Sequence, residues 1–210
     1  MTIDWYFDYL SPFVHLQAED FARRGWPLQL RCRPVLFAGL LNHWGQLGPA
    51  EIPPKKRFIF RQSLWRARQM GAELRAPRLH PFPPLTLLRL SIALDATPHQ
   101  VLEISRFVWR DGHVAEDAVP FSDLLERLGA PADIQTLLSS QAVKDQLRRN
   151  GNDAVAAGVF GVPALVVGGE IFWGADATDM CIDFVRGAPI FADPRMSEFD
   201  HIMVGAERPR

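Results

Sequence analysis

The sequence is poor in cysteine. Its 210 residues include only Cys32 and Cys181, which stand far apart in the chain. Two cysteines at this separation support neither a disulfide framework nor a zinc site of ordinary spacing, so we predict no metal site. Both fall on apolar stretches, where a cysteine is more often an inert core residue than a reactive one.

The chain also lacks an excess of charge and a long apolar run. Its 23 basic and 24 acidic residues give a net charge of -1, so no general field attracts nucleic acid or an anionic membrane. No stretch approaches the roughly 20 apolar residues that span a bilayer, and the N-terminus has no basic leader followed by an apolar core. We therefore expect a cytoplasmic protein with no membrane or nucleic-acid partner, and its 48% hydrophobic content suffices for a sizeable core.

The first 33 residues predict a strand, a helix and a second strand. Residues 2–9 alternate apolar and polar side chains, which is typical of a strand. Ser11 suits the N-cap of a helix, Pro12 suits its first turn, and Gly25 suits its C-terminal end. Residues 28–33 alternate again, so a second strand follows this helix.

The middle of the chain lacks any convincing strand. Five segments between residues 37 and 157 are typical of helices: 55–71, 84–96, 98–111, 120–129 and 141–157. The run GVFGVPALVVGGEIFWG then predicts a hairpin that turns at Gly168 and Gly169, and an amphipathic helix follows, with Asp176 and Asp179 as its capping pair. The residues after Gly187 are expected to be irregular.

This order of elements is that of an α/β protein with a thioredoxin-like fold and a long all-helical insertion. We assign residues 1–36 and 155–190 to the thioredoxin-like domain, 37–154 to the helical insertion domain, and 191–210 to an irregular C-terminal tail. Redox members of this fold begin the first helix with a Cys-Pro-X-Cys motif. Here the four residues from Ser11 to Val14 read SPFV, so both sulfurs are missing and thiol–disulfide exchange is disfavoured.

Four stretches together carry a resemblance to a known family: FDYLSPF (7–13), GQLGPAEIPPKKRF (45–58), FVWRDGHVAED (107–117) and FGVPALVVGGEIFWGAD (160–176). The chain resembles the glutathione-dependent 2-hydroxychromene-2-carboxylate isomerases and the kappa-class glutathione transferases, within the DsbA-like group. The resemblance covers roughly residues 1–190. It implies glutathione as the cofactor and a homodimer as the assembly.

The resemblance also explains the serine. A helix N-terminus favours an anion, and in redox relatives that anion is the thiolate of the enzyme. With Ser11 in place of the cysteine, the thiolate comes from glutathione, and the serine hydroxyl donates a hydrogen bond to it. Val162-Pro163 matches the cis-proline site of this fold, whose backbone binds the peptide part of glutathione.

Further matches are implied for the two ends of glutathione. Lys55 would pair with the glycine carboxylate, although a solvated surface lysine is the alternative, and Gln46 stands where the family often has asparagine. Asp176 would hold the γ-glutamyl end. Its neighbours Ala175 and Ala177 replace a small polar residue and an arginine, and Gln62 stands where an aspartate is expected, so glutathione affinity is put in doubt.

The resemblance implies an isomerase that acts on 2-hydroxychromene-2-carboxylate or a similar aromatic hydroxy-keto acid, in aromatic compound catabolism. Ser11 is the catalytic residue, and Phe13, Phe37 and Trp173 are interpreted as walls for the flat aromatic substrate. A kappa-like transferase that conjugates electrophiles is one alternative, and sequence separates it poorly from the isomerase. A non-catalytic binding protein of the same fold is another, because of the two alanines beside Asp176.

Overall fold

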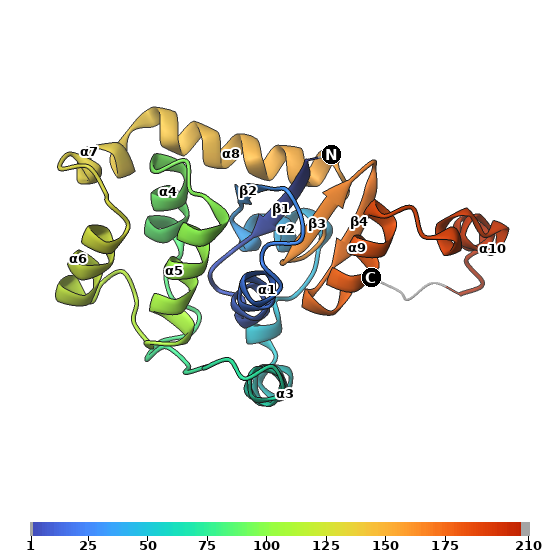
Figure 1. Ribbon diagram of the computed structural model, residues 1–210, viewed down its shortest axis with the longest axis horizontal. Helices are drawn as coiled ribbons and strands as arrows, with labels where there is room; N and C mark the ends of the chain where they lie inside the picture. The colour runs from blue at the N-terminus through green and yellow to red at the C-terminus, as the bar shows by residue number, and fades with distance from the viewer. Residues whose placement is uncertain (1, 207–210) are drawn as a thin grey trace.

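The computed structural model describes residues 2–206 and is built around one four-stranded mixed sheet (Figure 1). The strand order is β2 (Leu30–Pro34), β1 (Ile3–Phe7), β3 (Ala164–Val167) and β4 (Glu170–Trp173). Strand β1 pairs in parallel with β2 and antiparallel with β3, and Trp5 lies opposite both Cys32 and Leu165. The predicted α/β class and both predicted strand pairs are confirmed.

Local sequence explains the central strand of this sheet and its hairpin. Strand β1 is buried on both faces. Its consecutive residues Trp5, Tyr6 and Phe7 are all buried, which explains the apolar content of this strand. The hairpin between β3 and β4 turns at Gly168 and Gly169, whose φ angles are 61° and 87°. Two consecutive positive φ angles are what a tight two-residue hairpin needs, and glycine adopts them without strain.

Helix α1 (Pro12–Arg23) leaves the end of β1 and carries the first residues of the site. Ser11 occupies the N-cap position with extended backbone and Pro12 the first helical position, as predicted, but the serine hydroxyl does not cap the helix. The buried Gln17 accepts a hydrogen bond from the Trp5 indole at 2.8 Å and donates to the Thr178 hydroxyl at 3.0 Å. Helix α1 is therefore joined by hydrogen bonds both to β1 and to Thr178, near the C-terminal end of the domain.

The other helices occupy most of the remaining chain. They are α2 (Phe37–Trp44), α3 (Pro53–Gln69), α4 (Leu85–Ala93), α5 (Pro98–Trp109), α6 (Ala118–Arg127), α7 (Ile134–Ser139), α8 (Gln141–Ala156), α9 (Thr178–Val185) and α10 (Pro194–Glu198), with 3-10 turns at Pro49–Glu51, Ala175–Ala177, Pro189–Ala192 and Phe199–His201. The five predicted insertion helices are present, whereas α2 and α7 were not predicted.

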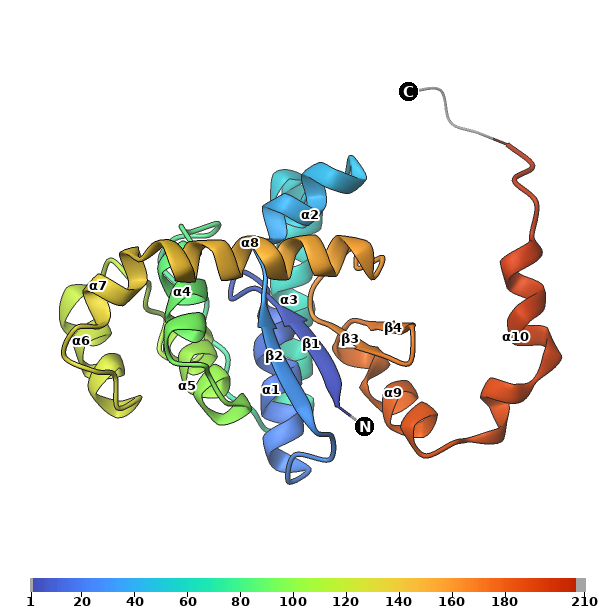
Figure 2. The same ribbon diagram turned by 90° about the horizontal axis from the view of Figure 1, so that it is seen from above.

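Two expectations for the C-terminal part differ from the structure. Helix α9 begins at Thr178 with Ala177 at its N-cap, so Asp176 and Asp179 do not form a capping pair, and Asp179 instead pairs with Arg24 of α1. The tail expected to be irregular contains α10 and two 3-10 turns, and it projects from the sheet domain as an arm (Figure 2). Residues 207–210 of that tail lie outside the described residues.

Helix α8 runs from the group formed by α4 to α7 to the sheet (Figure 2). Near its middle, the Asn150 side-chain amide donates to the Pro34 carbonyl at the end of β2, at 3.0 Å. Nearer its end, Asp153 pairs with Arg33 of β2. A single helix thus packs on both the insertion and the sheet, and the division at residue 154 stays a prediction.

Candidate functional site

A cavity of about 650 Å³ lies in front of the N-terminus of α1. Its walls come from the start of α1, from α2 and α3 with the segment between them, and from the residues before β3. Seven of the predicted site residues line it together: Ser11, Phe13, Phe37, Gln46, Lys55, Val162 and Trp173. Most of the other lining side chains are apolar, so the cavity suits a largely apolar molecule with few polar groups.

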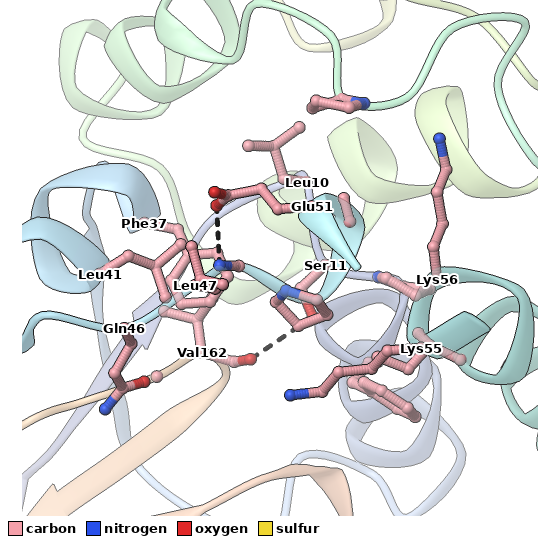
Figure 3. A pocket seen from close by; sticks show the side chains of 18 of the residues that line it. Leu10, Ser11, Phe37, Leu41, Gln46, Leu47, Glu51, Lys55, Lys56 and Val162 are labelled. Atoms are coloured by element: carbon pink, nitrogen blue, oxygen red, sulfur yellow. Dashed lines mark hydrogen bonds between the residues drawn. The ribbon is translucent and has the colours of Figure 1, made fainter. Parts of the chain in front are cut away.

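Ser11 faces the residue before the cis-proline. Its hydroxyl donates to the Val162 carbonyl at 3.4 Å, and its side chain is buried (Figure 3). The peptide bond between Val162 and Pro163 is cis, as the resemblance implies. No side chain caps the first turn of α1, so the positive end of this helix is open toward an incoming anion.

The two adjacent lysines of α3 differ in their surroundings. They leave the helix in different directions, with Lys55 directed to the same side of Ser11 as Val162 and Gln46, and Lys56 to the other side (Figure 3). The Lys56 amine donates to the His80 carbonyl at 2.5 Å. Both lysines line the larger cavity, and Lys55 is the more exposed of the two, so its predicted contact with a carboxylate stays a prediction.

A second, smaller cavity of about 190 Å³ adjoins the first and holds the two remaining predicted residues, Pro163 and Asp176. The side chain of Asp176 is 70% exposed, and its carboxylate lies 3.6 Å from the Arg66 guanidinium. Arg66 belongs to α3, and its guanidinium also lies over the Phe13 ring at 5.9 Å. This cavity therefore offers one cation and one anion close together.

Sequence analysis missed Arg66, although a signal was present. Lys55, Gln62 and Arg66 are separated by seven and four residues, so helical periodicity places them on one face of α3. The structure shows that all three line one of the two cavities. The other missed residues, among them Asp8, Glu51 and His80, carry no such local pattern.

Trp173 stands between the two cavities and packs closely on the loop before β3. Its ring lies 5.1 Å from that of Phe160, and its indole nitrogen approaches Gly161 so closely that a Cβ at this glycine would lie 2.5 Å from it. Glycine at position 161 therefore leaves the space that the Trp173 ring occupies. The residue is 54% exposed and can contact a ligand.

The cysteines are remote from this chemistry. Burial raises the pKa of Cys32 to about 12 and that of Cys181 to about 11, so both are protonated thiols at neutral pH. Within residues 2–206, no cluster of three or more histidine, cysteine or acidic side chains could hold a metal ion. None of the helices in that range is long and apolar enough to cross a membrane.

Comparison with known proteins finds relatives of two kinds, isomerases and kappa-class glutathione transferases. The chain is 28% identical over 203 residues to a 2-hydroxychromene-2-carboxylate isomerase of Pseudomonas sp. (strain C18), covering 90% of this chain and 92% of that protein. It is 26% identical over 181 residues to glutathione S-transferase kappa 1 of Rattus norvegicus, covering 79% and 80%. A solved structure of a 2-hydroxychromene-2-carboxylate isomerase superposes with a TM-score of 0.77 at 23% identity, covering 92% of this chain and 98% of that one.

These relatives confirm the resemblance to the isomerases and kappa-class transferases, and the structural match confirms the thioredoxin-like fold. The DsbA-like thioredoxin domain matches residues 2–186, which include every predicted site residue. The chain belongs to the DsbA-like thioredoxin family.

Proposed function

We propose that the protein is a glutathione-dependent isomerase acting on 2-hydroxychromene-2-carboxylate or a similar aromatic hydroxy-keto acid. The observation that carries this proposal is the Ser11 hydroxyl at the open N-terminus of α1, facing Val162 at the wall of a mostly apolar cavity. A cysteine at position 11 would supply an internal thiolate. A serine with about 650 Å³ of space beside it leaves room for a thiolate carried by another molecule.

The residues present fit glutathione, which carries a thiol, two carboxylates and an ammonium group. Lys55 suits one carboxylate, and the Arg66 and Asp176 pair suits the zwitterionic γ-glutamyl end. The backbone of Val162 suits the peptide part, in the manner of an added strand. Because Ala175 and Ala177 supply no polar side chain beside Asp176, we expect modest affinity.

Each residue then has a defined task. Ser11 turns its hydroxyl from the Val162 carbonyl to the sulfur, and the helix N-terminus lowers the pKa of the thiol. Bound glutathione would supply a thiolate for reversible addition to the conjugated ring-opened substrate, the chemistry that allows rotation about a former double bond before the thiolate leaves again. The aromatic side chains of Phe13, Phe37 and Trp173 hold the flat substrate and exclude water.

Calorimetric titration tests the binding step. Glutathione should bind saturably, and S-methylglutathione, which cannot form a thiolate, should bind more weakly. Ultraviolet assays with 2-hydroxychromene-2-carboxylate should then show isomerisation only when glutathione is present. Failure to bind at millimolar glutathione would reject this proposal and favour the non-catalytic binding protein.

A kappa-like transferase is the second candidate, and the match to glutathione S-transferase kappa 1 favours it. The two activities differ in what happens to the thiol. An isomerase regenerates glutathione, whereas a transferase consumes one molecule for each electrophile that it conjugates. Measuring free thiol during turnover therefore separates them, and the isomerase requires a constant concentration.

We also propose a homodimer, as the family resemblance implies. Helix α3 exposes Phe58, Leu64 and Trp65 beside the cavity wall, and these apolar side chains are where a second copy would pack. Sedimentation should give twice the monomer mass for the wild-type protein. Trp65→Glu should shift the protein to monomer, while a matched change of an exposed residue far away, Val119→Glu, should leave the dimer intact.

A further inference from the structure

The backbone of Leu10, directly before Ser11, is held at both its N–H and its C=O group. The Asp8 carboxylate accepts a hydrogen bond from the Leu10 amide at 3.0 Å. On the other side, the Leu10 carbonyl lies 2.9 Å from Nε2 of the His80 ring. Both contacts come from titratable side chains, and Leu10 and His80 line the larger cavity.

Asp8 also binds helix α2, which forms another wall of the cavity. Its side chain is fully buried, and its other carboxylate oxygen accepts the amide of Phe37 at 2.8 Å. Phe37 is the first residue of α2, so the carboxylate caps this helix from a position 29 residues earlier in the chain. A single side chain therefore joins the turn before Ser11 to α2.

His80 connects Leu10 to helix α3, which also lines the cavity. A carbonyl oxygen only accepts hydrogen bonds, so the contact with Leu10 places the ring proton on Nε2. The ring nitrogen Nδ1 is buried and has no partner within residues 2–206. The His80 carbonyl accepts from the Lys56 amine, which connects this residue to α3.

We propose that Asp8 and His80 are positioning residues that fix the backbone of Leu10 and thereby set the place of Ser11 against Val162. This role rests on the proposed function, because it is glutathione that the placement of Ser11 would serve. Neither side chain touches the reacting atoms. They act by joining the turn before α1 to α2 and α3, so a change in either contact shifts the serine relative to the other walls.

The contact made by Asp8 depends on pH. Burial raises the pKa of this carboxyl to about 6, against the effect of its two backbone hydrogen bonds. The ionised form offers a charged acceptor oxygen to each amide, and protonation turns one of these oxygens into a hydroxyl, which is a weaker acceptor and loosens that hydrogen bond. We therefore expect the placement of Ser11 to loosen below about pH 6.

The titratable neighbours of Asp8 do not account for this transition. Tyr9, on the same turn, has its pKa raised by burial and stays neutral. The pKa of His80 is lowered by burial and by the charge of Lys56 behind it, and protonated His80 still donates from Nε2 to Leu10. Helix α2 presents its N-terminal amide to the carboxylate.

Amide resonances of the protein without ligand test the contact directly. In nitrogen–proton correlation spectra, the Leu10 and Phe37 amides should titrate with one midpoint near pH 6, and Asp8→Asn should remove that midpoint. The amide of Val114 is an internal control because it donates to the Asp117 carboxylate, whose lowered pKa places its transition at more acidic pH. Absence of a midpoint between about pH 5 and about pH 7 in the wild type would overturn the proposal, even if the variant fails to fold.

Glutathione affinity tests the positioning role. Between about pH 7 and about pH 5, the wild type should lose about fivefold more glutathione affinity than Asp8→Asn, because the titration of the bound thiol is common to both proteins. Equal pH profiles in the two proteins would leave Asp8 with a structural role only and overturn the positioning role. If glutathione does not bind at any pH while both amides titrate, the proposed function fails but the contact made by Asp8 stands.

Discussion

The two ends of the candidate site are built differently. At the Ser11 end, polar groups from Asp8 to Ser11 have defined partners, including the Trp109 indole on the Tyr9 carbonyl at 2.8 Å and the Tyr9 hydroxyl on Ser91 at 2.6 Å. At the Asp176 end, one exposed carboxylate lies 3.6 Å from one guanidinium, and alanines flank it.

This difference separates two parts of ligand recognition. Buried hydrogen bonds hold the Ser11 end in place before a ligand arrives, so little order remains to be imposed there. An exposed ion pair contributes little by itself and must exchange its mutual contact for contacts with the ligand. We therefore expect the chemistry of the thiol to be retained in this chain while its affinity for the γ-glutamyl end is reduced.

The largest expected effect concerns the stability of the Ser11 end. The pKa of Asp8 is raised from 3.8 to about 6 in the folded protein, so the folded state holds this proton more tightly than the unfolded chain does. Stability from Asp8 is therefore greatest below about pH 4 and falls as the pH rises through 6, by about 3 kcal/mol. Urea unfolding should show Asp8→Asn gaining by about that amount relative to the wild type between about pH 4 and about pH 7.

Asp117→Asn is the matched control for this measurement. The pKa of Asp117 is lowered, chiefly by its hydrogen bond from the Val114 amide, so its contribution to stability is present above its unfolded pKa and is lost at lower pH. The variant should therefore lose stability relative to the wild type as the pH rises toward the ordinary carboxyl value of 3.8, and should change little between about pH 4 and about pH 7. The same sign for both variants would contradict our account of Asp8.

The next effect concerns Ser11 itself. Ser11→Ala should raise the pKa of bound glutathione and slow turnover by about thirtyfold, because a hydrogen bond to a charged group contributes about 2 kcal/mol. Ultraviolet absorbance of the thiolate against pH measures the first quantity. Stability should change little, since the hydroxyl contacts only the Val162 carbonyl at 3.4 Å. An unchanged thiolate titration would remove Ser11 from the catalytic role.

A smaller effect is expected at the other end. Arg66→Ala should weaken glutathione binding by about fivefold without changing the pKa of the bound thiol, because its contact is exposed and remote from the sulfur. Arg68→Ala, on the exposed face of the same helix, is the control. Conversely, Ala177→Arg should tighten binding. A shift of the thiol pKa in Arg66→Ala would show that the two ends are coupled.

The smallest effect on stability is expected at the wall between the cavities. Gly161→Ala places a methyl group against the Trp173 indole, and that half-exposed ring can move aside at a cost below about 1 kcal/mol. Thermal unfolding should therefore change little, while Trp173 fluorescence and glutathione affinity should both change. A large loss of stability would mean that the ring position is fixed by more than Gly161.

Much of the fold could be predicted because its signals are local. Strand β1, the glycine turn of the β3–β4 hairpin and the start of α1 each follow from residues that stand together in the sequence. Helix α2 was missed for the opposite reason. Its N-cap residue, Leu36, offers no capping side chain, and the group that binds its first amide is Asp8, far away in the sequence.

The same distinction applies to the site. Ser11, Val162 and Pro163 were found because short motifs carry them, and the roles assigned to them stay predictions. His80 was missed because its contact, the Leu10 carbonyl, lies 70 residues earlier, and a lone histidine shows no such partner in sequence. Arg66 lies between these cases, since helical spacing alone could have placed it beside Gln62.

The attachment of α2 at both ends has a kinetic consequence. Its first amide is held by Asp8, and at its last residue the Trp44 indole donates to the Val159 carbonyl at 2.9 Å. A helix held at both ends does not move as a rigid body. We therefore expect the entry and release of ligands to depend on motion of the connecting segment 45–52. Short surface segments move in nanoseconds to microseconds. Ligand residence times should therefore report the strength of the contacts inside the cavity, not the opening of a domain.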